Sequence, residues 1–171
     1  MQYTEQVKQA LKYAKQTAKQ CGQNYIGSEH LLMGLLREEH GMASAILKEC
    51  KVEEQKLMEL IRELIVPEGM LAERNSFEYS PRAAEILEQG EEEAEFFGQE
   101  KMGTEHLLLA ILKDVDCVAT RLLHTMGIQV QKVFMAVLEC LGLEESRYKD
   151  YMRTVKGSQS AGQQGGTMLE Q

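Results

Sequence analysis

Tryptophan is absent from this chain of 171 residues, and proline occurs only twice. No apolar run approaches the roughly 18 residues that a transmembrane helix requires. The N-terminal segment also lacks the apolar core of a signal peptide. We therefore expect a cytoplasmic protein that does not bind a membrane. The scarcity of proline, together with abundant Leu, Glu, Lys, Gln, Ala and Met, favours helices.

Positive charge is scarce, because 19 Lys and Arg residues face 27 Asp and Glu residues and give a net charge of −8. Proteins that bind nucleic acids without sequence preference need Lys and Arg to replace the counterions along the phosphates. The charge balance therefore argues against a nucleic-acid partner. With 43% hydrophobic and 27% charged residues, the composition is that of a folded globular protein.

Cysteine occurs four times, as Cys21, Cys50, Cys117 and Cys140, without a CxxC pair or a Cys/His cluster at zinc-finger spacing. Each cysteine lies in or beside an apolar helical pattern. Because cysteine behaves as a small hydrophobic residue in such places, we expect buried, reduced thiols and no bound metal.

Apolar residues recur at helical spacing in four segments of the first half of the chain. Ser28 is a favourable N-cap for the second of them, and Pro67 with Gly69 ends the last. The predicted helices span residues 4–21, 28–40, 42–50 and 52–66.

The same pattern returns 76 residues later. Between residues 3 and 52 the offset of 76 holds without a gap, and 13 of 50 positions are identical. The identities fall on glycines, helix starts and apolar sites, which are the positions that a fold constrains. We therefore interpret the pattern as an internal duplication.

The duplication predicts an all-α fold in which two tandem four-helix repeats pack as a pseudo-twofold eight-helix domain. Because each repeat supplies a partner surface for the other, we expect a monomer. The last segment, rich in Gly and Gln, is typical of a flexible linker toward a further module. The predicted boundaries are repeat 1 at 1–66, a connector at 67–78, repeat 2 at 79–145, an extension at 146–156 and the linker at 157–171.

The duplicated segment that carries polar chemistry reads IGSEHLL in the first repeat and MGTEHLL in the second. The structural interpretation is that each segment begins a helix. The hydroxyl residue is then the N-cap, the glutamate lies in the first turn near the positive helix end, and the histidine donates a hydrogen bond to a neighbouring carbonyl. The residues concerned are Ser28, Glu29 and His30, and Thr104, Glu105 and His106.

Two chemical interpretations of this segment fit poorly. Adjacent Glu and His side chains point about 100° apart on a helix, so they do not form a metal site with the usual i, i+3 or i, i+4 spacing. The chain also has no GxSxG, HExxH or GxxxxGK-Ser/Thr motif, so we expect no catalytic residues. A third interpretation is recognition. Glu29 and Glu105 would each bind a guanidinium, and the helix N-termini at Thr4 and Ser80 would bind phosphate.

The segments YTEQVKQALKYAKQTAKQCGQNYIGSEHLLMGLL and YSPRAAEILEQGEEEAEFFGQEKMGTEHLLLAIL resemble the double Clp N repeat. This is the N-terminal domain of ClpC- and ClpA-type AAA+ unfoldases, and the resemblance, over residues 3–142, is strongest to the ClpC type. It implies a binding module without its own cofactor. ATP and Mg would bind in ATPase modules of a larger, hexameric parent. The implied partners are protein substrates, adaptors of the MecA and McsB kinds and, through the parent, the ClpP protease.

The resemblance also implies recognition of phosphoarginine through two pockets, in which Glu29 and Glu105 hold the guanidinium. Residues that open each repeat would lie on the phosphate side, and those that match are Thr4, Ser80 and Arg82. The first repeat has Gln6 where the second has Arg82, so we expect unequal sites. The alternative function is a freestanding double-repeat adaptor or scaffold without an ATPase of its own.

Overall fold

The computed structural model describes residues 1–64 and 78–153. The predicted connector lies outside the described residues except for Glu78, and the predicted linker at 157–171 lies outside them entirely.

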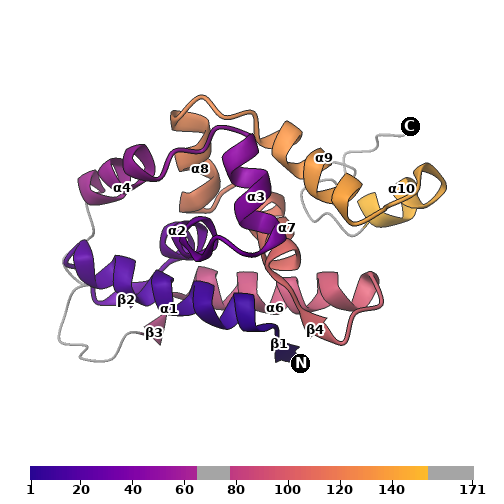
Figure 1. Cartoon of the computed structure of the whole chain (residues 1–171), viewed down its shortest axis with the longest axis horizontal. Coiled ribbons are helices and arrows are strands. Elements are labelled where there is room, and N and C mark those ends of the chain that lie inside the picture. The colour runs from indigo at the N-terminus through magenta and orange to yellow at the C-terminus, as the bar shows by residue number, and fades with distance from the viewer. Residues whose placement is uncertain (65–77, 154–171) are drawn as a thin grey trace, which may run out of the picture.

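Helices dominate the described part of the chain and confirm the all-helical double-repeat fold (Figure 1). The fourth helix is shorter than predicted, because the backbone is already extended at Leu64. The helices of the first half are α1 (Glu5–Gln20), α2 (Ser28–Glu38), α3 (Met42–Glu49) and α4 (Glu54–Glu63). Those of the second half are α6 (Pro81–Phe96), α7 (Thr104–Lys113), α8 (Val118–Thr125), α9 (Val130–Cys140) and α10 (Glu145–Met152).

Two pairs of very short parallel strands join the halves crosswise (Figure 1). Strand β1 (Gln2–Tyr3), before the first helix, pairs with β4 (Lys101–Met102) of the second half. Strand β3 (Glu78–Tyr79) pairs in the same way with β2 (Tyr25–Ile26) of the first half. Strands of two residues are too short to show an alternation of apolar and polar positions, so they could not be predicted from the sequence.

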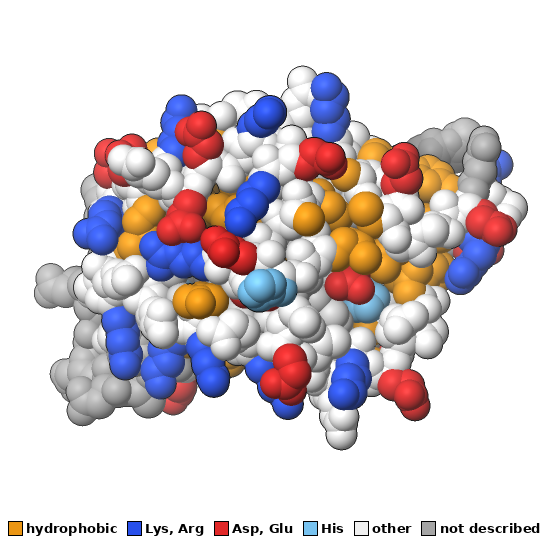
Figure 2. Space-filling view, in the orientation of Figure 1, with side chains coloured by type: hydrophobic (Ala, Val, Ile, Leu, Met, Phe, Trp, Pro, Cys, Tyr) orange, Lys and Arg blue, Asp and Glu red, His pale blue; other side chains and the backbone are white. Residues whose placement is uncertain are grey.

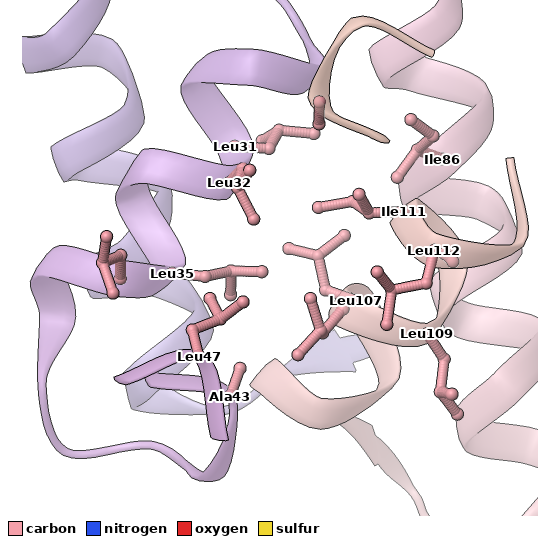
Figure 3. Packing of buried hydrophobic residues seen from close by; sticks show 14 of the residues in the cluster. Leu31, Leu32, Leu35, Ala43, Leu47, Ile86, Leu107, Leu109, Ile111 and Leu112 are labelled. Atoms are coloured by element: carbon pink, nitrogen blue, oxygen red, sulfur yellow. The ribbon is translucent and has the colours of Figure 1, made fainter. Parts of the chain in front are cut away.

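The core lies where α2 and α7 meet, at the boundary between the repeats. In Figure 3, Leu31 and Leu35 of α2 point toward Leu107 and Ile111 of α7, and all four side chains are buried. Burying a side chain of this kind stabilises a fold by about 1.5–3 kcal/mol. A continuous core across the boundary therefore makes each half dependent on the other. Helix α1 also packs closely on α2. Gly34 permits this approach, because a Cβ at that position would overlap the Ala10 carbonyl.

The starts of α2 and α7 correct one prediction. Glycine, not the hydroxyl residue, is the N-cap of each helix, at Gly27 and Gly103. The N–H of Gly27 donates to Nδ1 of His30 at 2.8 Å, and Gly103 donates to His106 at 2.9 Å. The histidine therefore closes its own helix start by accepting a backbone hydrogen bond, where the sequence predicted a donor to a carbonyl.

Ser28 and Thr104 cap helices of the opposite repeat instead of their own. The hydroxyl of Ser28 accepts the N–H of Ala119, the second residue of α8, at 3.0 Å. The hydroxyl of Thr104 accepts the N–H of Ala43, the second residue of α3, at 3.3 Å. Both bonds are buried. Each satisfies a helix-terminal N–H that has no partner within its own helix.

The two histidines differ at their other ring nitrogen. Nε2 of His30 contacts the side-chain oxygen of Gln23. Nε2 of His106 is buried and has no hydrogen-bond partner among the described residues. Because Nδ1 of His30 accepts a hydrogen bond, its neutral form carries the proton on Nε2 and donates it to Gln23. Burial lowers the pKa of His30 to about 4, which keeps the ring neutral at physiological pH.

We predict that removing a crosswise cap destabilises the whole domain. Thr104→Val keeps the side-chain shape but leaves the buried N–H of Ala43 without its partner, which costs about 1–3 kcal/mol. Urea unfolding measures this loss. The matched control is Thr125→Val, because that exposed hydroxyl bonds only to a carbonyl of its own helix. A Thr104→Val protein as stable as this control would contradict the role of the cap.

We also predict a loss of stability in acid that traces to His30. Its folded pKa, about 4, lies below the ordinary value of 6.5, so the unfolded chain binds a proton more readily than the folded one. The free energy of unfolding should therefore fall as the pH is lowered from about 6.5 toward 4, by about 3 kcal/mol from this residue. His30→Asn, whose side-chain oxygen can replace Nδ1, should reduce that slope. A slope in His30→Asn equal to that of the unsubstituted protein would refute the assignment.

Candidate functional site

The crosswise strand pairs bring the opening of each repeat to the Glu-His segment of the other. The N–H of Thr4 donates to the carbonyl of Met102 at 3.0 Å, directly before Gly103 and close along the chain to Glu105. We call these four residues the Glu105 corner. The N–H of Ser80 donates in the same way to the carbonyl of Ile26 at 2.9 Å.

The second group, Ser80, Ile26, Gly27 and Glu29, is the Glu29 corner. The structure therefore brings Thr4 near Glu105, and Ser80 near Glu29. This crosswise assignment could not be made from the sequence, because the duplication is equally consistent with pairing inside each repeat.

A helix begins in each corner, as the sequence predicted for Thr4 and Ser80. Thr4 is the N-cap of α1 and accepts the N–H of Val7 at 3.2 Å. Ser80 is the N-cap of α6 and accepts the N–H of Ala83 at 3.1 Å. Pro81 follows Ser80 and has no N–H, so the start of α6 offers one backbone donor fewer than the start of α1.

The glutamate carboxylates fold back over the glycines that begin α2 and α7. A Cβ at Gly27 would lie 2.5 Å from Oε1 of Glu29, and a Cβ at Gly103 would lie 2.6 Å from Oε1 of Glu105. The glycine of the motif therefore leaves the space that the carboxylate occupies. This placement holds both carboxylates at the positive ends of their helices.

Glu29 is enclosed by its surroundings. Its residue surface is only 3% exposed, and its Oε2 accepts the hydroxyl of Tyr25 at 3.0 Å. Burial raises the pKa of the Glu29 carboxyl, although its own backbone N–H and the Tyr25 hydroxyl act in the opposite direction. The Tyr25 ring also packs edge-on against His30, which holds it in place. A ligand that reaches Glu29 must therefore compete with Tyr25.

Glu105 is more accessible. Its side chain is only partly buried, and no hydrogen bond or ion pair to it is found among the described residues. Lys101 stands where the first repeat has Tyr25, at the offset of 76, and is exposed. The replacement of a tyrosine by a lysine is visible in the sequence. The hydrogen bond that Tyr25 donates to Glu29, and that Lys101 does not reproduce at Glu105, was not predicted.

Arg82 is exposed and forms an ion pair with an acidic side chain. Its guanidinium donates to both carboxylate oxygens of Asp114 at 2.9 Å. These hydrogen bonds raise the pKa of Arg82 further. Because Arg82 follows Ser80 by two residues, it belongs on the side of the Glu29 corner. A phosphate there would compete with Asp114 for the guanidinium.

One face of the molecule carries apolar side chains on its surface. Hydrophobic side chains gather on the right half of the face in Figure 2, over the region where α3, α7 and α9 meet. Met42 of α3 and Met135 of α9 are exposed. Charged side chains surround this area, so the face combines apolar contact surface with a polar rim.

The cysteines, the acidic and histidine side chains and the helices were also predicted to lack disulfides, metal sites and membrane spans. All four thiols are free, and Cys117 is buried as expected, but Cys140 is exposed and that prediction is wrong. Within residues 1–64 and 78–153, no three or more His, Cys, Asp or Glu side chains are placed to hold a metal ion. None of the described helices is long and apolar enough to cross a membrane.

Comparison with known proteins finds the same repeat. The family model of the Clp repeat (R) N-terminal domain matches residues 2–126 and again residues 78–164. The chain is 35% identical over 146 residues to the chaperone protein ClpB of Oceanobacillus iheyensis. It is 33% identical over 144 residues to ClpC/MecB of Bacillus subtilis, a negative regulator of genetic competence. These matches cover 85% and 84% of this chain but only 18% of each relative.

Solved N-terminal domains share the fold. The N-terminal domain of ClpD from Arabidopsis thaliana superposes with a TM-score of 0.67 at 20% identity and covers 82% of this chain and 97% of that domain. The Hsp104 N-terminal domain from Candida albicans gives 0.68 at 16% identity, over 84% and 94% of the two chains. Since the family model matches both halves of the sequence and the fold agrees, this chain belongs to the Clp repeat N-terminal domain family.

Proposed function

We propose that this chain is the part of a cytoplasmic ClpC-type unfoldase that receives substrates and adaptors. Family membership and the similarity to ClpC/MecB support this function. An N-domain of the same fold, that of ClpV, has been solved in complex with a VipB peptide. The parent would bind ATP and Mg in further modules, assemble as a hexamer, accept adaptors of the MecA and McsB kinds and pass substrates to ClpP.

The observation that carries the finer proposal is the composition of the two corners. Each combines a carboxylate at the start of one helix with the N-terminus of another helix from the opposite repeat. A carboxylate binds a guanidinium through paired, charge-assisted hydrogen bonds. Free N–H groups and the positive end of a helix bind phosphate. Phosphoarginine carries both groups on one side chain, so an arginine-phosphorylated protein fits the corners.

The Glu105 corner is the better candidate of the two. Its carboxylate is partly exposed and unpaired among the described residues, and the start of α1 offers the additional backbone donor. Lys101, in the strand that pairs with the residues before α1, is a candidate to supply the positive charge that Gln6 does not provide. In the Glu29 corner a ligand would have to displace Tyr25 from the carboxylate and would share the Arg82 guanidinium with Asp114. We therefore infer that phosphoarginine binds more tightly at Glu105.

We predict that Glu105→Ala weakens phosphoarginine binding by roughly ten- to a hundredfold, the value of one charge-assisted contact of about 1.5–3 kcal/mol. Glu29→Ala should change the tighter site less than threefold. Stability should fall by no more than about 1 kcal/mol in Glu105→Ala, because a first-turn carboxylate contributes little through the helix dipole. Isothermal titration calorimetry and thermal melting on the same samples separate the two effects.

The matched control is Glu100→Ala, which removes an exposed carboxylate near the corner. Phosphoserine and inorganic phosphate should bind much less well than phosphoarginine, because neither carries a guanidinium. Normal phosphoarginine binding by the Glu29→Ala/Glu105→Ala double variant would reject both corners as the site.

A further inference from the structure

A buried pair of opposite charges lies outside both corners, between α6 and α7. Nζ of Lys113 lies 2.6 Å from Oε2 of Glu93, and the two side chains are 5% and 2% exposed. Gln89 donates a further hydrogen bond to Oε2 at 2.7 Å. Withdrawing two charges from water is unfavourable by several kcal/mol for each ion, and such a pair needs good partners on every side. The substrate-binding proposal makes no use of this pair.

Tyr151 of α10 completes the cover over the pair. Its hydroxyl donates to Oε1 of Glu93 at 3.0 Å, and the residue is fully buried. The Lys113 ammonium lies 4.6 Å from the centroid of the Tyr151 ring. The ring also packs against three phenylalanines. We call the residues around the ring the Tyr151 socket: Glu93, Lys113, Phe96, Phe97 and Phe134.

The first repeat closes the equivalent place in a different way. At the offset of 76, Glu93 and Lys113 correspond to Thr17 and Arg37, which form a hydrogen bond of 3.0 Å. The repeat's own fourth helix closes this pair, because Glu54 and Met58 both contact the Arg37 guanidinium.

In α9, the fourth helix of the second repeat, the positions equivalent to Glu54 and Met58 are Val130 and Phe134. Neither side chain can form an ion pair with Lys113. The second repeat therefore depends on α10, a helix outside the duplicated pattern, to enclose its buried charges.

The attachment of α10 is slight. Its backbone makes no extensive approach to another described helix, and it lies at the edge of the molecule beside α9 (Figure 1). Apart from Tyr151, Tyr148 and Met152 are half-buried and the other described side chains of the helix are exposed. An isolated helix of eight residues is unstable in water. Arg147 lies 4.9 Å from the centroid of the Phe96 ring, and the Tyr148 hydroxyl contacts the sulfur of Met135 at 4.0 Å. Tyr151 is nevertheless the one fully buried side chain among those described in α10.

Opposing free-energy terms act on the docking of Tyr151. Burying the ring and forming the hydroxyl bond favour docking. Docking also keeps Glu93 and Lys113 away from water, and undocking would return part of their hydration energy. These terms oppose one another, so docking of α10 gains less free energy than burial of the ring alone would provide.

We propose that α10 is a reversible latch. Tyr151 leaves its socket, α10 loses its helix, and water reaches Glu93 and Lys113 while the remaining described helices stay folded. Because α10 is the last described helix, the latch would determine whether residues 145–152 are held against the rest of the domain.

Native-state amide hydrogen exchange on the full chain tests the latch. The amides of α10 should exchange at least a hundredfold faster than those of α2 and α7, through an opening that leaves those helices protected. Tyr151→Ala should accelerate exchange in α10 at least tenfold further and change α2 and α7 less than threefold. The control Tyr148→Ala, in the same helix but without a bond to Glu93, should accelerate α10 less than threefold.

A second variant addresses the role of the charges. Glu93→Gln with Lys113→Met removes the hydration that favours opening and keeps an oxygen for the Tyr151 hydroxyl, so exchange in α10 should slow about tenfold. Exchange of α10 at the same rate as α7 in wild type would overturn the proposal. So would loss of protection in α6 and α7, or failure to fold, in Tyr151→Ala, because α10 would then be an integral part of the core.

Discussion

Each repeat contributes one buried hydroxyl group that caps a helix of the other repeat, directly beside the glutamate of each corner. Ser28 caps α8 and Thr104 caps α3, and the strand pairs β1–β4 and β2–β3 cross the same boundary. A helix cap contributes about 1 kcal/mol, and a buried one more, because its loss leaves an N–H without a partner. These directional bonds are weak beside the leucine core, which is not directional. They determine the relative placement of the halves, and thereby which glutamate lies beside which helix start.

The four residues of the repeated motif have four separate roles. Gly27 leaves room for a carboxylate, Ser28 caps the other repeat, Glu29 lies at the positive helix end, and His30 closes the helix start on the glycine. The second copy repeats the scheme, but its neighbours have changed, since Lys101 replaces the tyrosine that encloses Glu29. Duplication thus preserved the residues that build the fold, while the residues around each carboxylate diverged and made the corners unequal.

The sequence was sufficient for the part of the structure that depends on periodicity. Apolar spacing and the offset of 76 predicted the two repeats and their helices, and Thr4 and Ser80 were predicted as helix starts. Helix α10, which lies almost wholly in the predicted extension, was not predicted. The prediction of Ser28 as a cap of α2 was wrong because N-cap preference is a local rule and the bond to Ala119 spans 91 residues. The socket of Tyr151 was missed for the same reason, since nothing near Glu93 in the sequence indicates a cover from α10.

Neither repeat should form its structure without the other. To test this, residues 1–66 and 79–153 are prepared as separate chains, and amide NMR spectra are recorded for each alone and for an equal mixture. We expect poorly dispersed spectra for each chain alone, and dispersed spectra with protected amides at Ala43 and Ala119 only after mixing. A native-like spectrum with a protected Ala43 or Ala119 amide in either chain alone would contradict it.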